Sequence, residues 1–111
     1  MSFGYKILGQ AAPADTNNAD LYTVPAATEA IVSSIAVANV TATAATYRIY
    51  IRAAGATAAD SNALVKDASA AANSTTVIGI GITLSATDVI TVQSGTANAI
   101  TVHAFGTEAS A

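Results

Sequence analysis

Two arginines and a tyrosine alternate along one short segment, and their side chains are the ones best suited to bind a partner. Arg48, Tyr50 and Arg52 lie in ATYRIYIRAAG, positions 45–55, and the two arginines are half of the four basic residues in the chain. On a strand all three point to one side, with the arginines about 13 Å apart at ~3.3 Å per residue. Arginine forks bind carboxylates, and Arg and Tyr are enriched where protein surfaces dock. We therefore predict that this face contacts a neighbouring subunit. The alternative is a solvated face whose charges protect a sheet edge.

The other polar residues form no set that could catalyse a reaction. His103 is the only histidine, and a general base needs an orienting partner and a nucleophile, which the sequence does not pair with it. The seven acidic residues are scattered without the spacing of a calcium loop, and cysteine is absent. We therefore expect no enzymatic activity, no cofactor and no tightly bound metal.

Gly79-Ile80-Gly81 has part of the spelling of a phosphate-binding loop. Neither a following helix nor a lysine accompanies it, and it lies inside an apolar run typical of a strand. We predict instead that a neighbouring segment approaches the backbone closely at these glycines.

The composition indicates a surface that packs against other chains. Only 10% of the residues are charged, against about 25% in ordinary soluble domains, and the net charge is −3. That charge gives no electrostatic basis for binding nucleic acid. The hydrophobic content of 52% includes many alanines, so the core is thin, and there are no cysteines to form disulfides. We expect a homo-oligomer, a dimer or a trimer, to add stability.

No segment of the sequence predicts export or membrane insertion. Residues 1–8 lack a basic region followed by an apolar one, and no apolar run reaches the ~18–20 residues that span a bilayer. We therefore expect synthesis in a cytoplasm and no membrane partner.

Apolar residues recur at every second position, and turn residues interrupt them at short intervals, which is typical of antiparallel strands. The eight predicted strands are Tyr5–Gly9, Asp20–Val24, Ala30–Asn39, a strand within 45–55, Ala63–Asp67, Thr76–Leu84, Asp88–Ser94 and Asn98–Gly106. They indicate an all-β fold, an antiparallel β-sandwich of jelly-roll or immunoglobulin-like type. The competing interpretation is a helix within Ala58–Asn73, whose alanines favour helix but leave it little to bury.

The predicted domain comprises residues 1–111, with a short arm at 1–4 and a tail at 107–111. The residues predicted to point into the sandwich are Ile31, Ile35, Val37, Tyr47, Ile49, Ile51, Ile78, Ile80, Ile82, Ile90, Val92, Ile100 and Val102.

Several phrases, in order along the chain, resemble small structural proteins of tailed bacteriophages. They are YKILGQ at 5–10, LYTVP at 21–25, ATYRI at 45–49, GITL at 81–84 with Asp88-Val89, and FGTE at 105–108. The resemblance implies a non-enzymatic β-sandwich of the virion, most simply a capsid cement or decoration protein that binds the major capsid protein and stabilises the head. It supplies no catalytic residues. We add Phe3 and Phe105 to the candidate partner contacts.

Other kinds of protein are compatible with the same pattern. A neck, tail or fibre-associated subunit is the alternative within the virion, and a fibre-forming adhesion subunit would suit a surface rich in Thr and Ala. A carbohydrate-binding module would need aromatic platforms, and the chain has no Trp and only four Tyr.

Overall fold

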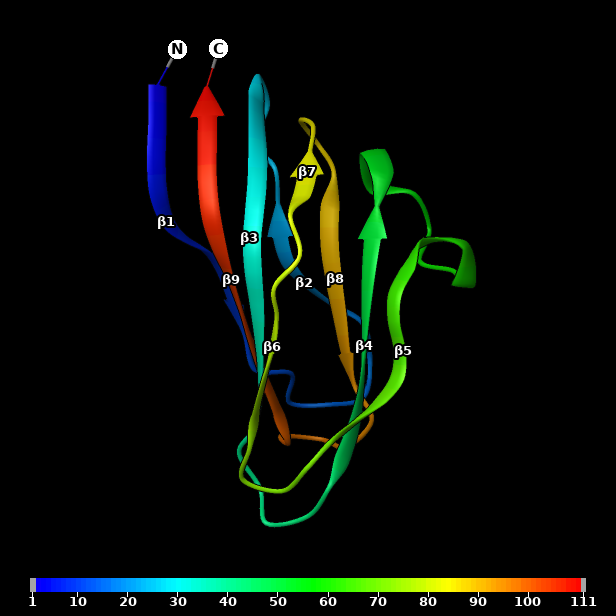
Figure 1. Cartoon of the computed structure of the whole chain (residues 1–111). Helices are drawn as coiled ribbons and strands as arrows, with labels where there is room; N and C mark the ends of the chain where they lie inside the picture. The colour runs from blue at the N-terminus through cyan, green and yellow to red at the C-terminus, as the bar shows by residue number, and fades with distance from the viewer. Residues whose placement is uncertain (1, 111) are drawn as a thin grey trace.

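The computed structural model describes residues 2–110, which form two antiparallel β-sheets packed face to face (Figure 1). The predicted β-sandwich is therefore confirmed. The strands are β1 (Ser2–Ala11), β2 (Ala19–Thr23), β3 (Thr28–Asn39), β4 (Ala45–Arg52), β5 (Ala63–Ala70), β6 (Thr75–Ile78), β7 (Ile82–Leu84), β8 (Val89–Ser94) and β9 (Ile100–Ser110). Among residues 2–110 there is no α-helix, and none could therefore span a membrane.

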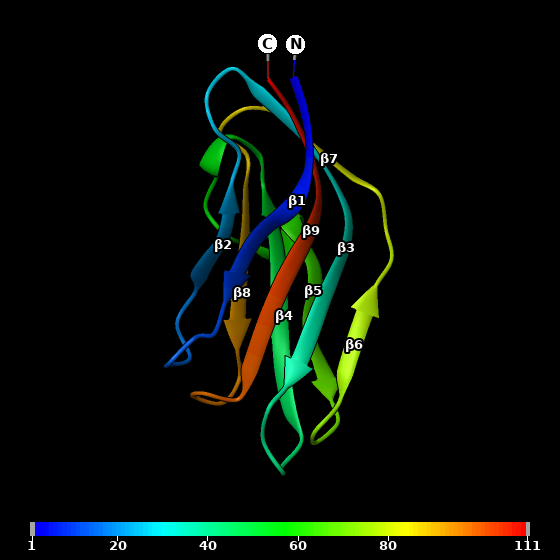
Figure 2. The ribbon, with the colours of Figure 1, turned by 90° about the vertical axis from the view of Figure 1, so that its left-hand side faces the viewer.

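Each sheet is assembled from strands that are distant in the sequence. Sheet A has the order β1-β9-β3-β6, with β7 pairing beside β6 on the same edge of β3. Sheet B has the order β2-β8-β4-β5. Figure 2, turned by 90°, looks onto the side of the sandwich where β1 and β2 lie. The first and last strands are adjacent in sheet A, so the N- and C-terminal segments support one another.

The core lies between the sheets, and half of its buried hydrophobic residues are the β-branched Val and Ile. This is the composition expected for strands with one buried face, because branched side chains pack well on a pleated surface. The inward predictions that the structure confirms as buried are Ile35, Val37, Tyr47, Ile49, Ile90, Val92, Ile100 and Val102. Ile51, Ile78 and Ile82 are partly buried and pack against this core.

A bulge in β3 corrects the prediction for Ile31. The pairing of β3 with β9 shifts between Val32 and Ser34, so Ser33 is an extra residue. An extra residue moves every side chain beyond it to the opposite face. Ile35 therefore points inward, whereas Ile31 points outward and is 54% exposed. The Ser33 hydroxyl donates to the carbonyl of Phe105 at 3.1 Å and satisfies it beside the bulge.

The segment predicted as one strand from Thr76 to Leu84 is two strands, and Gly79-Ile80-Gly81 separates them. Glycine is costly to order in a strand and has no side chain to pack there. Ile80, predicted to point inward, is consequently 43% exposed. A Cβ added at Gly79 or Gly81 would meet nothing within 4 Å, so the predicted close approach at these glycines is wrong.

The remaining differences concern where strands begin and end. Residues 63–70 form β5 after a single 3-10 turn at Asp60–Asn62, and the competing helix does not form. Residues 2–4 of the predicted arm and 107–110 of the predicted tail are strand, because β1 begins at Ser2 and pairs with β9 as far as Ser110, while residues 1 and 111 lie outside the described part of the chain. Residues 2–4 of β1 pair with residues 108–110 of β9, which also pair with β3 on their other side.

Candidate interaction surface

Arg48, Tyr50 and Arg52 do lie together, on the outer face of sheet B, but they bind groups of their own chain. Arg48 holds Asp67 of β5 with two bonds, Nε to Oδ1 at 2.6 Å and Nη2 to Oδ2 at 3.0 Å. This pairing lowers the pKa of Asp67 and raises that of Arg48. The Tyr50 ring is only 6% exposed, so it is already buried without a partner.

Arg52 joins the loop after β4 to two neighbouring strands. Its guanidinium donates to the carbonyls of Ala56 at 2.6 Å and Gly55 at 3.0 Å. It also donates to Asp20 of β2 at 3.2 Å and to the hydroxyl of Thr91 of β8 at 3.0 Å. The contact with another subunit remains a prediction, and the geometry gives these arginines a structural role inside the chain.

The outer face of sheet A has a different character. Its most exposed apolar side chains are Tyr5 (90%) and Ile7 (53%) of β1, Ile31 (54%) of β3 and Val77 (65%) of β6. The pairing register places Tyr5, Thr107, Ile31 and Thr83 in one row across four strands. Phe105, a predicted contact residue, lies opposite Ile7 in the next row. We call the surface formed by Tyr5, Ile7, Ile31, Val77, His103 and Phe105 the apolar face.

His103 forms part of this face and has a packing role there. Its Nδ1 is 2.9 Å from Nε2 of Gln10 on β1, and its ring stacks on Phe105 with the centroids 6.1 Å apart. Within the described part of the chain, no three His, Cys, Asp or Glu residues converge as metal ligands. The arrangement can therefore offer stacking and apolar contact to a partner.

A shallow hollow of about 270 Å³ opens near one end of this face. It is lined by Glu29, Ala30, Ile31, Thr83, Leu84, Thr107 and Ala109. The lining is mostly apolar with one carboxylate, which suits a protruding side chain of a partner more than a charged ligand.

Sequence reasoning located little of the apolar face. It included Phe105, and it named Phe3, whose side chain lies outside the part of the chain that the structure describes. It assigned Ile31 to the core because the bulge has no clear signal in the sequence. In β1, Tyr5 and Ile7 alternate with Lys6, and this pattern does not say which side faces the core.

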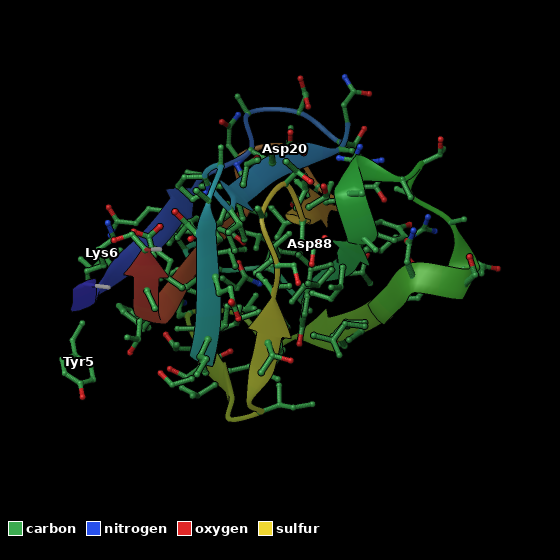
Figure 3. All side chains as sticks on the ribbon, turned by 90° about the horizontal axis from the view of Figure 1, so that it is seen from above. Tyr5, Lys6, Asp20 and Asp88 are labelled. Atoms are coloured by element: carbon green, nitrogen blue, oxygen red, sulfur yellow. The ribbon has the colours of Figure 1, made fainter. Side chains whose placement is uncertain are left out.

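A cluster of Lys6, Glu108 and Tyr22 joins the two sheets at one end of the sandwich. The Glu108 carboxylate lies 2.6 Å from Nζ of Lys6 and accepts a 2.5 Å hydrogen bond from the hydroxyl of Tyr22 on β2. Figure 3 shows Lys6 beside β9, and Tyr5 projecting away from the body of the molecule. Lys6 first, and then Tyr22, lower the pKa of Glu108, while burial and the nearby carboxylate raise that of Tyr22.

This cluster predicts that acid destabilises the fold. A carboxyl whose pKa is lower in the folded state stabilises the fold at pH values above its unfolded pKa, ~4 for Glu. That stabilisation is lost as the pH falls through the lower, folded pKa. We expect Glu108→Gln to be less stable than the wild type at pH 7, and to lose less on acidification to pH 3 in thermal unfolding. Glu29→Gln, on the outer face, is the matched control and should follow the wild type. Equal acid sensitivity of Glu108→Gln and the wild type would contradict the assignment.

The described strands define the chain as an antiparallel β-sandwich with one polar and one apolar outer face. No family model matches the sequence, and neither does any curated protein. The fold is similar to that of a chain in the structure of infectious bursal disease virus, Gx strain, with a TM-score of 0.50 and 13% identity. The match covers 96% of this chain and 31% of that one, so this chain spans less than a third of the viral chain.

Proposed function

We propose that this chain is a structural protein of a virus particle, a cement or decoration protein that binds the head of a tailed bacteriophage. The observation that carries the proposal is the apolar face. The resemblance of its phrases to tailed-phage structural proteins supports the phage assignment, and the fold likeness to a chain of a virus structure agrees with a virion role. The protein acts by binding, without catalysis, cofactor or metal.

The apolar face explains why such a protein would bind. Exposed apolar patches larger than roughly a few hundred Å² are uncommon on monomeric proteins and mark sites of association. Burying it contributes roughly 25 cal/mol per Å² of apolar area. Threonine and alanine fill the space between the large side chains, and Glu29 and Glu108 are the only acids on β3 and β9. A neighbouring capsid subunit can cover such a surface without having to desolvate many charges.

The test compares variants of the two outer faces for binding to purified particles stripped of this protein. The triple variant Tyr5→Thr, Ile31→Thr, Val77→Thr removes apolar area while keeping residues that favour strands. We expect its affinity to fall at least tenfold, corresponding to ~1.4 kcal/mol. Lys66→Ala on sheet B, outside both the apolar face and the arginine face, is the matched control and should bind like the wild type. Arg48→Ala is measured beside it as the test of the arginine face.

Each other outcome has a definite meaning. Unchanged binding by the triple variant would overturn the role of the apolar face. Weak binding by Arg48→Ala alone would return the docking site to the arginine face. Binding of the wild type to purified tails and not to heads would replace the cement assignment with a neck, tail or fibre-associated subunit.

A further inference from the structure

The free edge of β1 is a second feature suited to association, distinct from the apolar face. Among residues 2–110, β1 pairs with β9 and with no other strand. In Figure 2, β1 lies in front of sheet A, and no other described ribbon segment passes over its N-terminal half. An exposed strand edge presents unpaired backbone N–H and C=O groups, which another extended strand can bind.

The other strand edges of the sandwich carry features that prevent such pairing. The strands β6 and β7 have only four and three residues. β2 has five residues and a register shift between Asp20 and Tyr22. β5 is irregular where it pairs with β4, carries Lys66 and Asp67, and has a positive φ of 56° at Asp67. Short length, irregularity and charge are known protections of sheet edges.

β1 lacks these protections over its first part. Ser2–Ile7 pairs with β9 without a break, and the register shifts only beyond Ile7. The one charged residue of this stretch, Lys6, shares the inner side of the sheet with its register partner Gly106, and its ammonium binds Glu108 at 2.6 Å. Its charge is therefore held over the sheet and does not block the edge.

We propose that two copies of this chain associate through their β1 edges, antiparallel about a twofold axis at Tyr5. The pairing would continue sheet A from one copy into the other. This inference concerns the isolated protein and does not rest on the proposed function.

Charge and side-chain type favour a second copy as the occupant, and they select the register. With the axis at Tyr5, the two Tyr5 side chains lie opposite each other, and Lys6 lies opposite Gly4, where a Cβ has nothing within 4 Å. Apolar and aromatic cross-strand pairs stabilise a sheet, and like charges placed opposite each other destabilise it. An axis at Lys6 would oppose two lysines, whereas the Tyr5 register opposes no like charges. Tyr5, 90% exposed in the monomer, gains a cross-strand neighbour while its outer side stays on the apolar face.

The dimer would also enlarge the surface available to a larger partner. A twofold axis at the β1 edge places the two apolar faces side by side on one continuous sheet. Because symmetric pairing uses the same strand on both copies, the contact closes after two chains and does not propagate into filaments.

Charge-swap variants at Tyr5 test this arrangement on the full chain by sedimentation velocity. Wild type should form dimers, whereas Tyr5→Lys and Tyr5→Glu alone should each dimerise at least tenfold more weakly because like charges meet at the axis. An equimolar mixture of the two variants should recover the dimer as a heterodimer. Val77→Lys, on β6, is the control and should dimerise like the wild type. A monomeric wild type, a trimer, or dimers that persist in both single variants would overturn the proposal.

A cysteine at the axis gives a second, register-specific readout. The chain contains no cysteine, so Tyr5→Cys introduces a single thiol. Directly opposed strand residues have Cα atoms about 4.5–5.5 Å apart, within the range that a disulfide bridges. Mild oxidation should therefore give covalent dimers of Tyr5→Cys and mostly monomers of Val77→Cys. Equal crosslinking of the two variants would contradict the register. Both assays omit the virus particle, so their failure leaves the docking test of the apolar face unaffected.

Discussion

Gly106→Ala is expected to lower the free energy of unfolding by about 2 kcal/mol or more. A methyl group at this position would lie 2.0 Å from the carbonyl oxygen of Ile31 and 3.0 Å from Cα of Val32. Both neighbours belong to the backbone of β3, which pairs with β9 and cannot turn aside as a side chain could. The strands would have to separate beside the bulge at Ser33. Thermal and denaturant unfolding would measure the loss, about 8 °C or more in Tm for a domain of this size.

Alanine substitutions at two other glycines test whether the destabilisation of Gly106→Ala comes from the close backbone contact. At Gly9 an added methyl would lie 2.0 Å from the carbonyl oxygen of Leu21, so Gly9→Ala should be destabilised by a similar mechanism. At Gly79 it would meet nothing within 4 Å, so Gly79→Ala should match the wild type or gain slightly from a less flexible unfolded chain. If Gly106→Ala melted with Gly79→Ala, the close approach of β3 and β9 would be wrong.

Arg52→Ala is expected to loosen the loop that follows β4 and to cost about 1–2 kcal/mol of stability. The loop carbonyls of Gly55 and Ala56 would lose their donor, and Asp20 of β2 would lose its ion pair. The loop would keep other bonds, including those from the Ala54 N–H to Asp88 at 2.8 Å and from Lys66 to Asp60 at 2.5 Å, so it should loosen without detaching. Amide hydrogen exchange should rise in residues 53–62 and much less in the core strands.

The ion pair between Lys66 and Asp60 provides the control for the Arg52→Ala prediction. Lys66 binds Asp60 at 2.5 Å, and both side chains are largely exposed to solvent. Exposed pairs of this kind contribute little, so Lys66→Ala should leave both stability and exchange in residues 53–62 nearly unchanged. Unaltered exchange in Arg52→Ala would mean that the loop does not depend on the arginine.

The strands could be predicted from the sequence because apolar residues that alternate with polar ones mark the buried face of a strand. Ile49, Ile90 and Val92 lie in β4 and β8, and all three are buried between the sheets as their alternation predicts. The same reasoning placed Arg48, Tyr50 and Arg52 on a single face, and the structure agrees. The sequence does not predict which residues bind these arginines. Their partners Asp20 and Asp67 reach that face only because β2 and β5 join the same sheet as β4.

The sequence by itself determined an all-β sandwich and most of its core. Only the tertiary structure decided which apolar residues remain outside. A single extra residue in β3 reverses the direction of Ile31, and two glycines end β6 before Ile80. Both effects depend on pairing with a distant strand: register is a property of two strands together, whereas alternation is a property of one. The apolar face and the free edge of β1 therefore emerge only when sheet A is assembled.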